Sequence, residues 1–417
     1  MKKLFHRRYF LFFVFFTLYL ILAIVLSNEK FTGDEGRYVK FALNLTNGYY
    51  SPPEKINLWS GPGYPIILMP FLEFKLDLLY AKILNSIFLL GALIYFYKSI
   101  ILYTNGKTAL ISTGLLGLYY PFYIYLPSLL TEIFSIFLVC GFGYHLLRSY
   151  STKRKTQIIL ASLFLGFLAL TKVIYGYVIL VTIGVFLVMF ILKISKVRTT
   201  LFIFVLSLIW CLPYLIYTYN LTGKIFYWSN SGSQSLYWMS SPYTDEYGDW
   251  HGISNLEKYP KLNANHEQFF NQISKFDNLK KDALLKEKAI KNIISKPQKY
   301  FTNWLANWGR MIMSYPYTYT PQKLSTYFYL PNFIIVFIVL IIIYPVIIMR
   351  KIIPTELLYL LIFTLMYLFL SSLVSAKPRQ FFLSVPFLLF IITFVLSNSG
   401  IEIHILNKVF KFGSNNP

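Results

Sequence analysis

Residues 9–38 read YFLFFVFFTLYLILAIVLSNEKFTGDEGRY, and they join a long apolar run to a short polar one. The apolar part, residues 9–26, is close to the length of about 20 residues that carries a helix across a bilayer. A polar run, Thr32 to Tyr38, follows it and contains two adjacent carboxylates, Asp34 and Glu35. The stretch therefore predicts a membrane protein whose first polar loop carries unusual charges beside the membrane.

The composition of the whole chain agrees with this prediction. Of 417 residues, 56% are hydrophobic and only 13% are charged, and the mean hydropathy is +0.54. These values exclude an ordinary soluble protein. The net charge of +22 comes mostly from short basic clusters between apolar runs, which are topology signals and suit the headgroups of membrane lipids. We therefore exclude nucleic acid as a partner.

The apolar runs predict an all-α polytopic protein with about ten membrane-spanning helices. Segment 61–74 is apolar but short and contains three prolines, so an interfacial or re-entrant segment is expected there. The expected spans are 9–27, 79–101, 108–126, 129–147, 157–171, 174–192, 200–219, 329–349, 355–373 and 381–397.

Basic residues in the short loops predict the orientation of these spans. They occur at both termini and in every second loop between the predicted spans, which places both termini in the cytoplasm by the positive-inside rule. Residues 1–397 then form one membrane-integral unit, and 398–417 form a cytoplasmic tail. The long loops 28–78 and 220–328 lie outside, the second of them partly helical. The basic residues are Lys2, Lys3, Arg7, Arg8, Lys98, Lys107, Arg148, Lys153, Arg154, Lys155, Lys193, Lys196, Arg198, Arg350, Lys351, Lys408 and Lys411.

The polar run after the first span predicts a helix start. Thr32 followed by Glu35 matches a capping box, and apolar residues from Tyr38 to Leu45 recur at helical spacing. An amphipathic helix is therefore expected on the outer membrane surface. Glu35 then has a structural role with Thr32, while Asp34 stays available, because adjacent helical residues point about 100° apart. The alternative is that both carboxylates only complement the helix dipole.

Isolated charges stand at the outer ends of three further spans. Glu132 lies just inside the fourth span, Lys172 ends the fifth, and Lys377 and Arg379 precede the tenth. Charges at this depth are costly and tend to pair or to act on a substrate, although lysines can also snorkel to the interface. Their common side favours a shared site for an anionic lipid phosphate, which arginine can bind with two hydrogen bonds.

Several stretches in this order resemble the type C membrane glycosyltransferases of the protein-mannosyltransferase and aminoarabinose-transferase kind. Residues 33–38 resemble the family's Asp-Glu motif, and 61–65 (GPGYP) resemble its Gly-Pro-x-Tyr-Pro stretch. Residues 166–172, 213–232 and 377–380 resemble later family stretches, with Lys172, Tyr219 and Gln380 standing where Arg, Arg and Tyr are common. The likeness covers roughly residues 9–390.

The resemblance implies transfer of a sugar from a polyprenyl-phosphate carrier to an acceptor hydroxyl outside the cytoplasm, usually with inversion. A lipid phosphate leaves without a protein acid, so one carboxylate, Asp34, suffices as general base. A glycosidase, by contrast, normally needs two cooperating carboxylates. The donor-binding residues implied are Lys172, Lys377, Arg379, Glu132 and Tyr64, the cations stabilising the departing phosphate.

Several points stay open at this stage. Asp34 and Glu132 could contribute to a divalent-cation site, although nothing in the sequence requires one. Glycan, lipid and protein acceptors are all compatible with the pattern, and the plasma (inner) membrane is the expected location. Two other functions compete. A transporter or lipid flippase would put charges at mid-membrane and show repeated halves. An external polysaccharide polymerase or ligase would share the span count.

Overall fold

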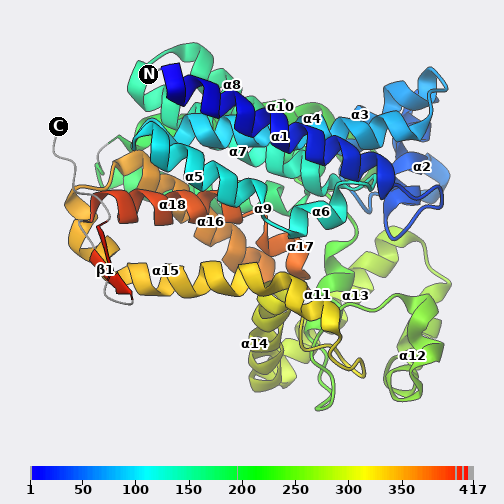
Figure 1. Cartoon of the computed structure of the whole chain (residues 1–417). Helices are drawn as coiled ribbons and strands as arrows, with labels where there is room; N and C mark the ends of the chain where they lie inside the picture. The colour runs from blue at the N-terminus through cyan, green and yellow to red at the C-terminus, as the bar shows by residue number, and fades with distance from the viewer. Residues whose placement is uncertain (1, 195, 400–401, 406–407, 412–417) are drawn as a thin grey trace.

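The computed structural model describes residues 2–194, 196–399, 402–405 and 408–411. Helices α1, α5, α15 and α18 lie with their axes roughly aligned, and further helices pack among them to form what we call the helical body (Figure 1). Its helices are α1 (Lys2–Val25), α4 (Leu78–Ile100), α5 (Gly106–Gly117), α7 (Thr131–Thr152), α8 (Lys155–Thr171), α9 (Ile174–Ile191), α10 (Val197–Thr222), α15 (Leu330–Ile348), α16 (Thr355–Ser372) and α18 (Val385–Asn398).

Within the described residues, seven segments are long and apolar enough to cross a membrane, and α8 and α18 are shorter apolar helices. The chain is thus an all-α, multi-pass membrane protein, as predicted. The remaining elements are mostly short. They are α2 (Glu35–Thr46), η1 (Pro53–Lys55), α3 (Gly63–Glu73), α6 (Pro121–Tyr125), α11 (Gly232–Met239), η2 (Ile253–Lys258), α12 (Pro260–Ser274), α13 (Asn278–Ser295), α14 (Pro297–Met313), η3 (Leu324–Tyr329), η4 (Met349–Lys351), α17 (Pro378–Phe381), β1 (Glu402–Ile405) and β2 (Lys408–Lys411).

One predicted span is wrong as a continuous helix. Residues 108–126 divide into α5, which has only 12 residues, and the separate five-residue helix α6. Pro121 explains the break, because it lacks the backbone N–H that would bond to the carbonyl of Gly117 in a continuous helix, and it stands instead in the first turn of α6. The carbonyl of Gly117 at the end of α5 accepts hydrogen bonds from the hydroxyls of Tyr19 (2.9 Å) and Tyr123 (2.8 Å), which satisfy it within the protein.

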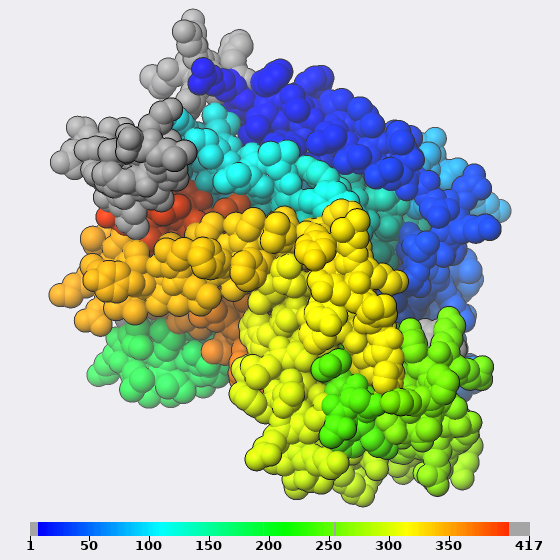
Figure 2. Space-filling view, turned by 60° about the horizontal axis from the view of Figure 1, so that its bottom comes forward, coloured from blue at the N-terminus to red at the C-terminus, as the bar shows by residue number. Residues whose placement is uncertain are grey.

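Both long loops gather at one end of the helical body, which we call the loop end (Figure 1). In Figure 2 the yellow-green to yellow segments of loop 220–328 form a lobe against this end. The two loops are joined directly: Asn230 donates its backbone N–H to the carbonyl of Leu58 (3.1 Å), and Asn278 donates from its side chain to Ile56 (2.8 Å). The lobe has a small apolar core of its own around Trp238, while loop 28–78 shares the core of the helical body.

Candidate active site

The turn before α2 sets the direction of the two adjacent carboxylates. Gly33 has a positive φ of 56°, a conformation that glycine adopts at little cost, and α2 begins only at Glu35. Asp34, rather than Thr32, is therefore the N-cap residue, and its side chain makes no capping hydrogen bond. The capping box is wrong in its register, because the left-handed turn at Gly33 prevents the helix from starting one residue after Thr32.

Glu35 nevertheless has the structural role that was expected. Its carboxylate accepts hydrogen bonds from the backbone N–H of Thr32 (2.6 Å), the hydroxyl of Thr32 (3.0 Å) and the backbone N–H of Leu129 (2.7 Å). The side chain is buried. Glu35 thus ties the start of α2 to the segment before α7 and points away from Asp34.

We expect Glu35→Gln to lower stability by about 1–3 kcal/mol while the folded protein stays active, since an amide loses charge-assisted bonds to buried N–H donors. Thermal unfolding in detergent and activity per folded molecule measure the two effects separately. A loss of activity per folded molecule at normal stability would contradict the structural role of Glu35.

Asp34 faces a group of cations. Its carboxylate pairs with Arg37 (2.9 Å), one turn along α2, and with Arg379 (3.1 Å) of α17. Burial alone would raise the pKa of Asp34, but Arg379, Arg37 and the more distant Lys172 outweigh it and hold this pKa below its ordinary value. Asp34 is therefore ionised at neutral pH.

Glu132 pairs with two cations of the same group. It lies fully buried in the first turn of α7, with its carboxylate 2.6 Å from the ammonium group of Lys172 and 3.8 Å from the guanidinium of Arg379. Arg379 thus stands between Asp34 and Glu132. A divalent cation bound by both carboxylates would have to displace this guanidinium, so the two residues as placed do not fit a shared metal site. Within the described residues, no cluster of three or more potential metal ligands occurs.

Lys377 completes the group from the cavity side. Its side chain lines the cavity, and its ammonium lies 5.8 Å from the ring centroid of Trp250. Partial burial and the neighbouring Arg379 lower the pKa of Lys377, so an incoming anion would relieve an unfavourable charge. We call the whole group the charge cluster, with four cations, two carboxylates and a net charge of +2: Arg37, Lys172, Lys377, Arg379, Asp34 and Glu132.

The Gly61-Pro62-Gly63 stretch brings loop 28–78 against the end of α8, beside Lys172. A Cβ atom on Gly61 would lie 2.0 Å from the carbonyl oxygen of Leu170, and one on Gly63 would lie 2.3 Å from the hydroxyl of Thr171. Only glycine permits this approach. Tyr64, by contrast, is fully buried edge-on against Tyr38 and does not line the cavity where the donor was expected to bind.

Gly61→Ala should therefore lower the amount of folded protein sharply, because a methyl group cannot be accommodated against a backbone oxygen without shifting α8. Gly114→Ala is the matched control, since a Cβ there would meet nothing within 4 Å. Membrane abundance and thermal unfolding of both variants test the expectation, which fails if they behave alike.

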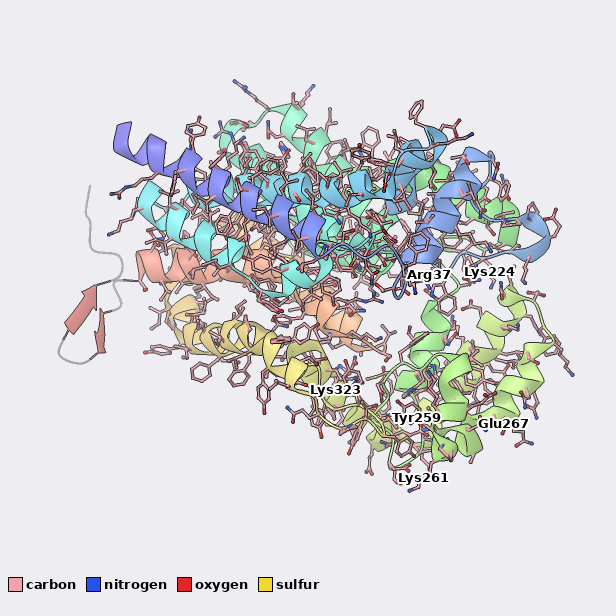
Figure 3. All side chains as sticks on the ribbon, turned by 45° about the vertical axis from the view of Figure 1, so that its right-hand side comes forward. Arg37, Lys224, Tyr259, Lys261, Glu267 and Lys323 are labelled. Atoms are coloured by element: carbon pink, nitrogen blue, oxygen red, sulfur yellow. The ribbon has the colours of Figure 1, made fainter. Side chains whose placement is uncertain are left out.

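The charge cluster, apart from Glu132, lines a cavity of about 1280 Å³, larger than the roughly 300–1,000 Å³ typical of small-molecule sites. One wall is apolar and comes from α9 and α16, with Ile174, Tyr177, Val181 and Leu370 among its residues. Another wall comes from the two loops and includes five serines and two tryptophans. Figure 3 shows Arg37 and Lys224, which both line the cavity, near the junction of the helical body and the lobe.

Glu132 was predicted to contact the donor, but it is excluded from the cavity surface and reaches it only through Lys172 and Arg379. Arg37 was missed as a site residue, although its spacing three residues after Asp34 at a helix start could have indicated the pair. Trp59 and Trp250 also line the cavity without having been assigned a role. Nothing local in the sequence distinguishes Trp250 from the interfacial aromatics around it.

No protein-family model matches the sequence, and no curated protein matches it either. Among solved structures, an oligosaccharyltransferase from Archaeoglobus fulgidus, tethered to an acceptor peptide with an NVT sequon, has a TM-score of 0.52 at 13% identity over 93% of this chain. AglB from the same organism, in complex with an inhibitory peptide and a dolichol-phosphate, has a TM-score of 0.50 at 12% identity, also over 93%.

This chain spans about half the length of those structures, 49% and 50% respectively. ArnT from Cupriavidus metallidurans, bound to undecaprenyl phosphate, has a TM-score of 0.41 at 11% identity, with 91% of this chain and 77% of that chain covered. The two archaeal structures confirm, at the level of the fold, the predicted resemblance to type C membrane glycosyltransferases.

Proposed function

We propose that this protein is a glycosyltransferase that moves a sugar from a polyprenyl-phosphate carrier to an acceptor hydroxyl. The observation that carries the proposal is an ionised carboxylate, Asp34, held between two arginines in a large cavity that has an apolar wall. The fold shared with an archaeal enzyme that holds a dolichol-phosphate adds support. The loop end then faces outward across the plasma (inner) membrane, with both termini in the cytoplasm.

The donor uses the charge cluster and the apolar wall together. A lipid phosphate is an anion on a hydrocarbon chain, and the net charge of +2 beside Ile174 and Val181 complements both parts. Lys377, Lys172 and Arg379 contact the phosphate. The isoprenoid chain lies along α9 and α16, from which it continues into the membrane.

The reaction is a single displacement at the anomeric carbon. Asp34 accepts the proton of the acceptor hydroxyl, whose oxygen bonds to the anomeric carbon as the bond to the phosphate oxygen breaks. The bonding electrons leave with the phosphate, and the cations stabilise its charge. As negative charge develops on the departing phosphate, Arg379 interacts more strongly with the phosphate and less with Asp34. The pKa of Asp34 therefore rises, so Asp34 is more basic at the moment of proton transfer. The product has inverted anomeric configuration.

A shared divalent cation has no step in this mechanism, because Arg379 stands between the two carboxylates that would hold it. A flippase is disfavoured, since the charge cluster lies at the loop end of the helical body rather than halfway along it.

The deciding experiment uses the purified full-length chain in lipid nanodiscs. Radiolabelled undecaprenyl-phosphate sugars are added with membrane extracts, and the labelled product is isolated and its anomeric configuration read by NMR. Transfer of single sugars with inversion supports the proposal. Transfer of preassembled oligosaccharide blocks would instead indicate a polymerase or ligase. If none of the labelled sugars is transferred from its carrier, the proposed function is overturned.

The acid limb of the pH profile should depend on Arg37. Because Asp34 must be ionised and its pKa is held low, transfer should persist as the pH falls below the ordinary value for aspartate, about 3.9, and disappear only as the pH passes through the lowered pKa. Arg37→Gln removes one of the stabilising cations, so this limb should move to higher pH. An unchanged limb in kcat/KM against pH, which reports the free enzyme, would show that another group controls it.

A further inference from the structure

Trp250 is placed in the cavity by a segment of the lobe that is held from both sides. It lies between α11 and η2, lines the cavity and has Lys377 near its ring. At Tyr247, three residues earlier, the backbone N–H donates to the hydroxyl of Thr318 (3.0 Å) and the carbonyl accepts from Arg310 (2.8 Å). Arg310 is completely buried, so this anchor is part of the interior of the lobe.

The two neighbours of Trp250 in sequence are also fixed. Asp249 accepts a hydrogen bond from the backbone N–H of Thr318 (3.0 Å), and its carboxylate lies 3.0 Å from the ring of His251. Both side chains are buried, and His251 packs edge-on against Trp238, with ring centroids 5.2 Å apart. Of the three consecutive residues, only Trp250 faces the cavity. The buried polar contacts around it thus hold an indole ring at the cavity wall.

The loop residues that line the same cavity as Trp250 include several hydroxyl groups and a second indole. Ser229 donates to the carbonyl of Trp59 (3.2 Å) and contacts the hydroxyl of Ser231 (2.7 Å), while the guanidinium of Arg37 lies 5.8 Å from the ring of Trp59. Hydroxyl groups both donate and accept hydrogen bonds, as sugar hydroxyls do. The serines of this wall are Ser60, Ser229, Ser231, Ser233 and Ser235.

We propose that Trp250 is an acceptor-binding residue and that the acceptor is a carbohydrate whose ring stacks on this indole. The proposal rests on the proposed function, in which the donor lipid takes the apolar wall and leaves the loop wall to the acceptor. The C–H face of a pyranose ring is attracted to the negative face of an aromatic ring, and its hydroxyls pair with the serines around it.

A peptide acceptor fits this wall less well. Strand addition is one way in which proteins hold an extended peptide, and the described cavity lining, which comes from helices and loops, offers no strand edge for it. The cavity offers side-chain hydroxyls and aromatic faces in place of such an edge.

The test measures binding to the full-length chain in nanodiscs loaded with undecaprenyl phosphate. The probes are a panel of methyl pyranosides and β- and α-linked disaccharides and tetrasaccharides, with a hexapeptide containing serine and threonine for comparison. We expect saccharides to bind, and Trp250→Ala to weaken that binding about tenfold or more. Trp250→Phe, which keeps an aromatic face, should recover most of it. Phe301→Ala is the matched control, an exposed aromatic of α14 outside the cavity.

The same samples separate the possible outcomes. Undecaprenyl phosphate should bind the wild type and Trp250→Ala equally, as measured by thermal stabilisation. If it does not bind the wild type, the proposed function fails. If it binds but no saccharide does, or if only the hexapeptide binds, the carbohydrate acceptor is wrong. If Trp250→Ala loses carrier and saccharide together, Trp250 supports the structure or the donor site, and its role toward the acceptor is refuted.

Discussion

The Asp34→Asn variant should lose sugar transfer by about 10³-fold in kcat, the middle of the range for removing a general base. An amide of the same shape cannot accept the proton of the acceptor hydroxyl. The substitution also removes one negative charge from the charge cluster, whose net charge of +2 then rises to +3. Binding of undecaprenyl phosphate should therefore be preserved or tightened while turnover disappears.

Glu54→Gln provides the matched control, because Glu54 is an exposed carboxylate of the same loop that does not line the cavity. It should transfer sugar at the wild-type rate. Steady-state transfer, carrier binding and thermal unfolding are measured for both variants. Near-normal transfer by Asp34→Asn would remove Asp34 as the base. Loss of folded protein instead of turnover would show that its pairing with Arg37 and Arg379 is mainly structural.

The Arg379→Gln variant should lose about 10²–10³-fold in kcat/KM, comparable to removing one donor that stabilises developing negative charge. Folding should survive, since Asp34 keeps Arg37 at 2.9 Å and Glu132 keeps Lys172 at 2.6 Å. Competitive inhibition by undecaprenyl phosphate should weaken in parallel, because the phosphate loses a cation.

Arg379→Lys distinguishes position from charge. A lysine ammonium is a point charge that lacks the planar fork of a guanidinium, so it should restore little of the activity. Arg350→Gln, at an exposed arginine of η4 outside the cavity, is the control and should behave as wild type. Full activity of Arg379→Lys would mean that a single positive charge suffices, and that the bridge from Asp34 to Glu132 has no catalytic importance.

The parts predicted well from the sequence depend on local patterns. Apolar length identified most of the spans, and adjacent positions at a helix start gave Asp34 and Glu35 different directions. Predicted helix boundaries were wrong where one residue changes the backbone geometry. Pro121 divides the span predicted at 108–126, and the positive φ of Gly33 moves the start of α2 past Thr32. Tyr64 belongs to a recognisable stretch, yet the packing against Tyr38 buries it away from the cavity.

The sequence alone identifies a helical membrane protein, because apolar length and helical periodicity are local properties of consecutive residues. The polar run at 32–38 is also visible in the sequence as two adjacent carboxylates beside an apolar segment. The partners of that run come from the tertiary structure, since Asp34 meets Arg379 across 345 positions of the chain. Trp250 reaches the same cavity only through the buried contacts of Arg310 and Thr318. Such contacts depend on how distant segments pack, and no spacing in the sequence encodes them directly.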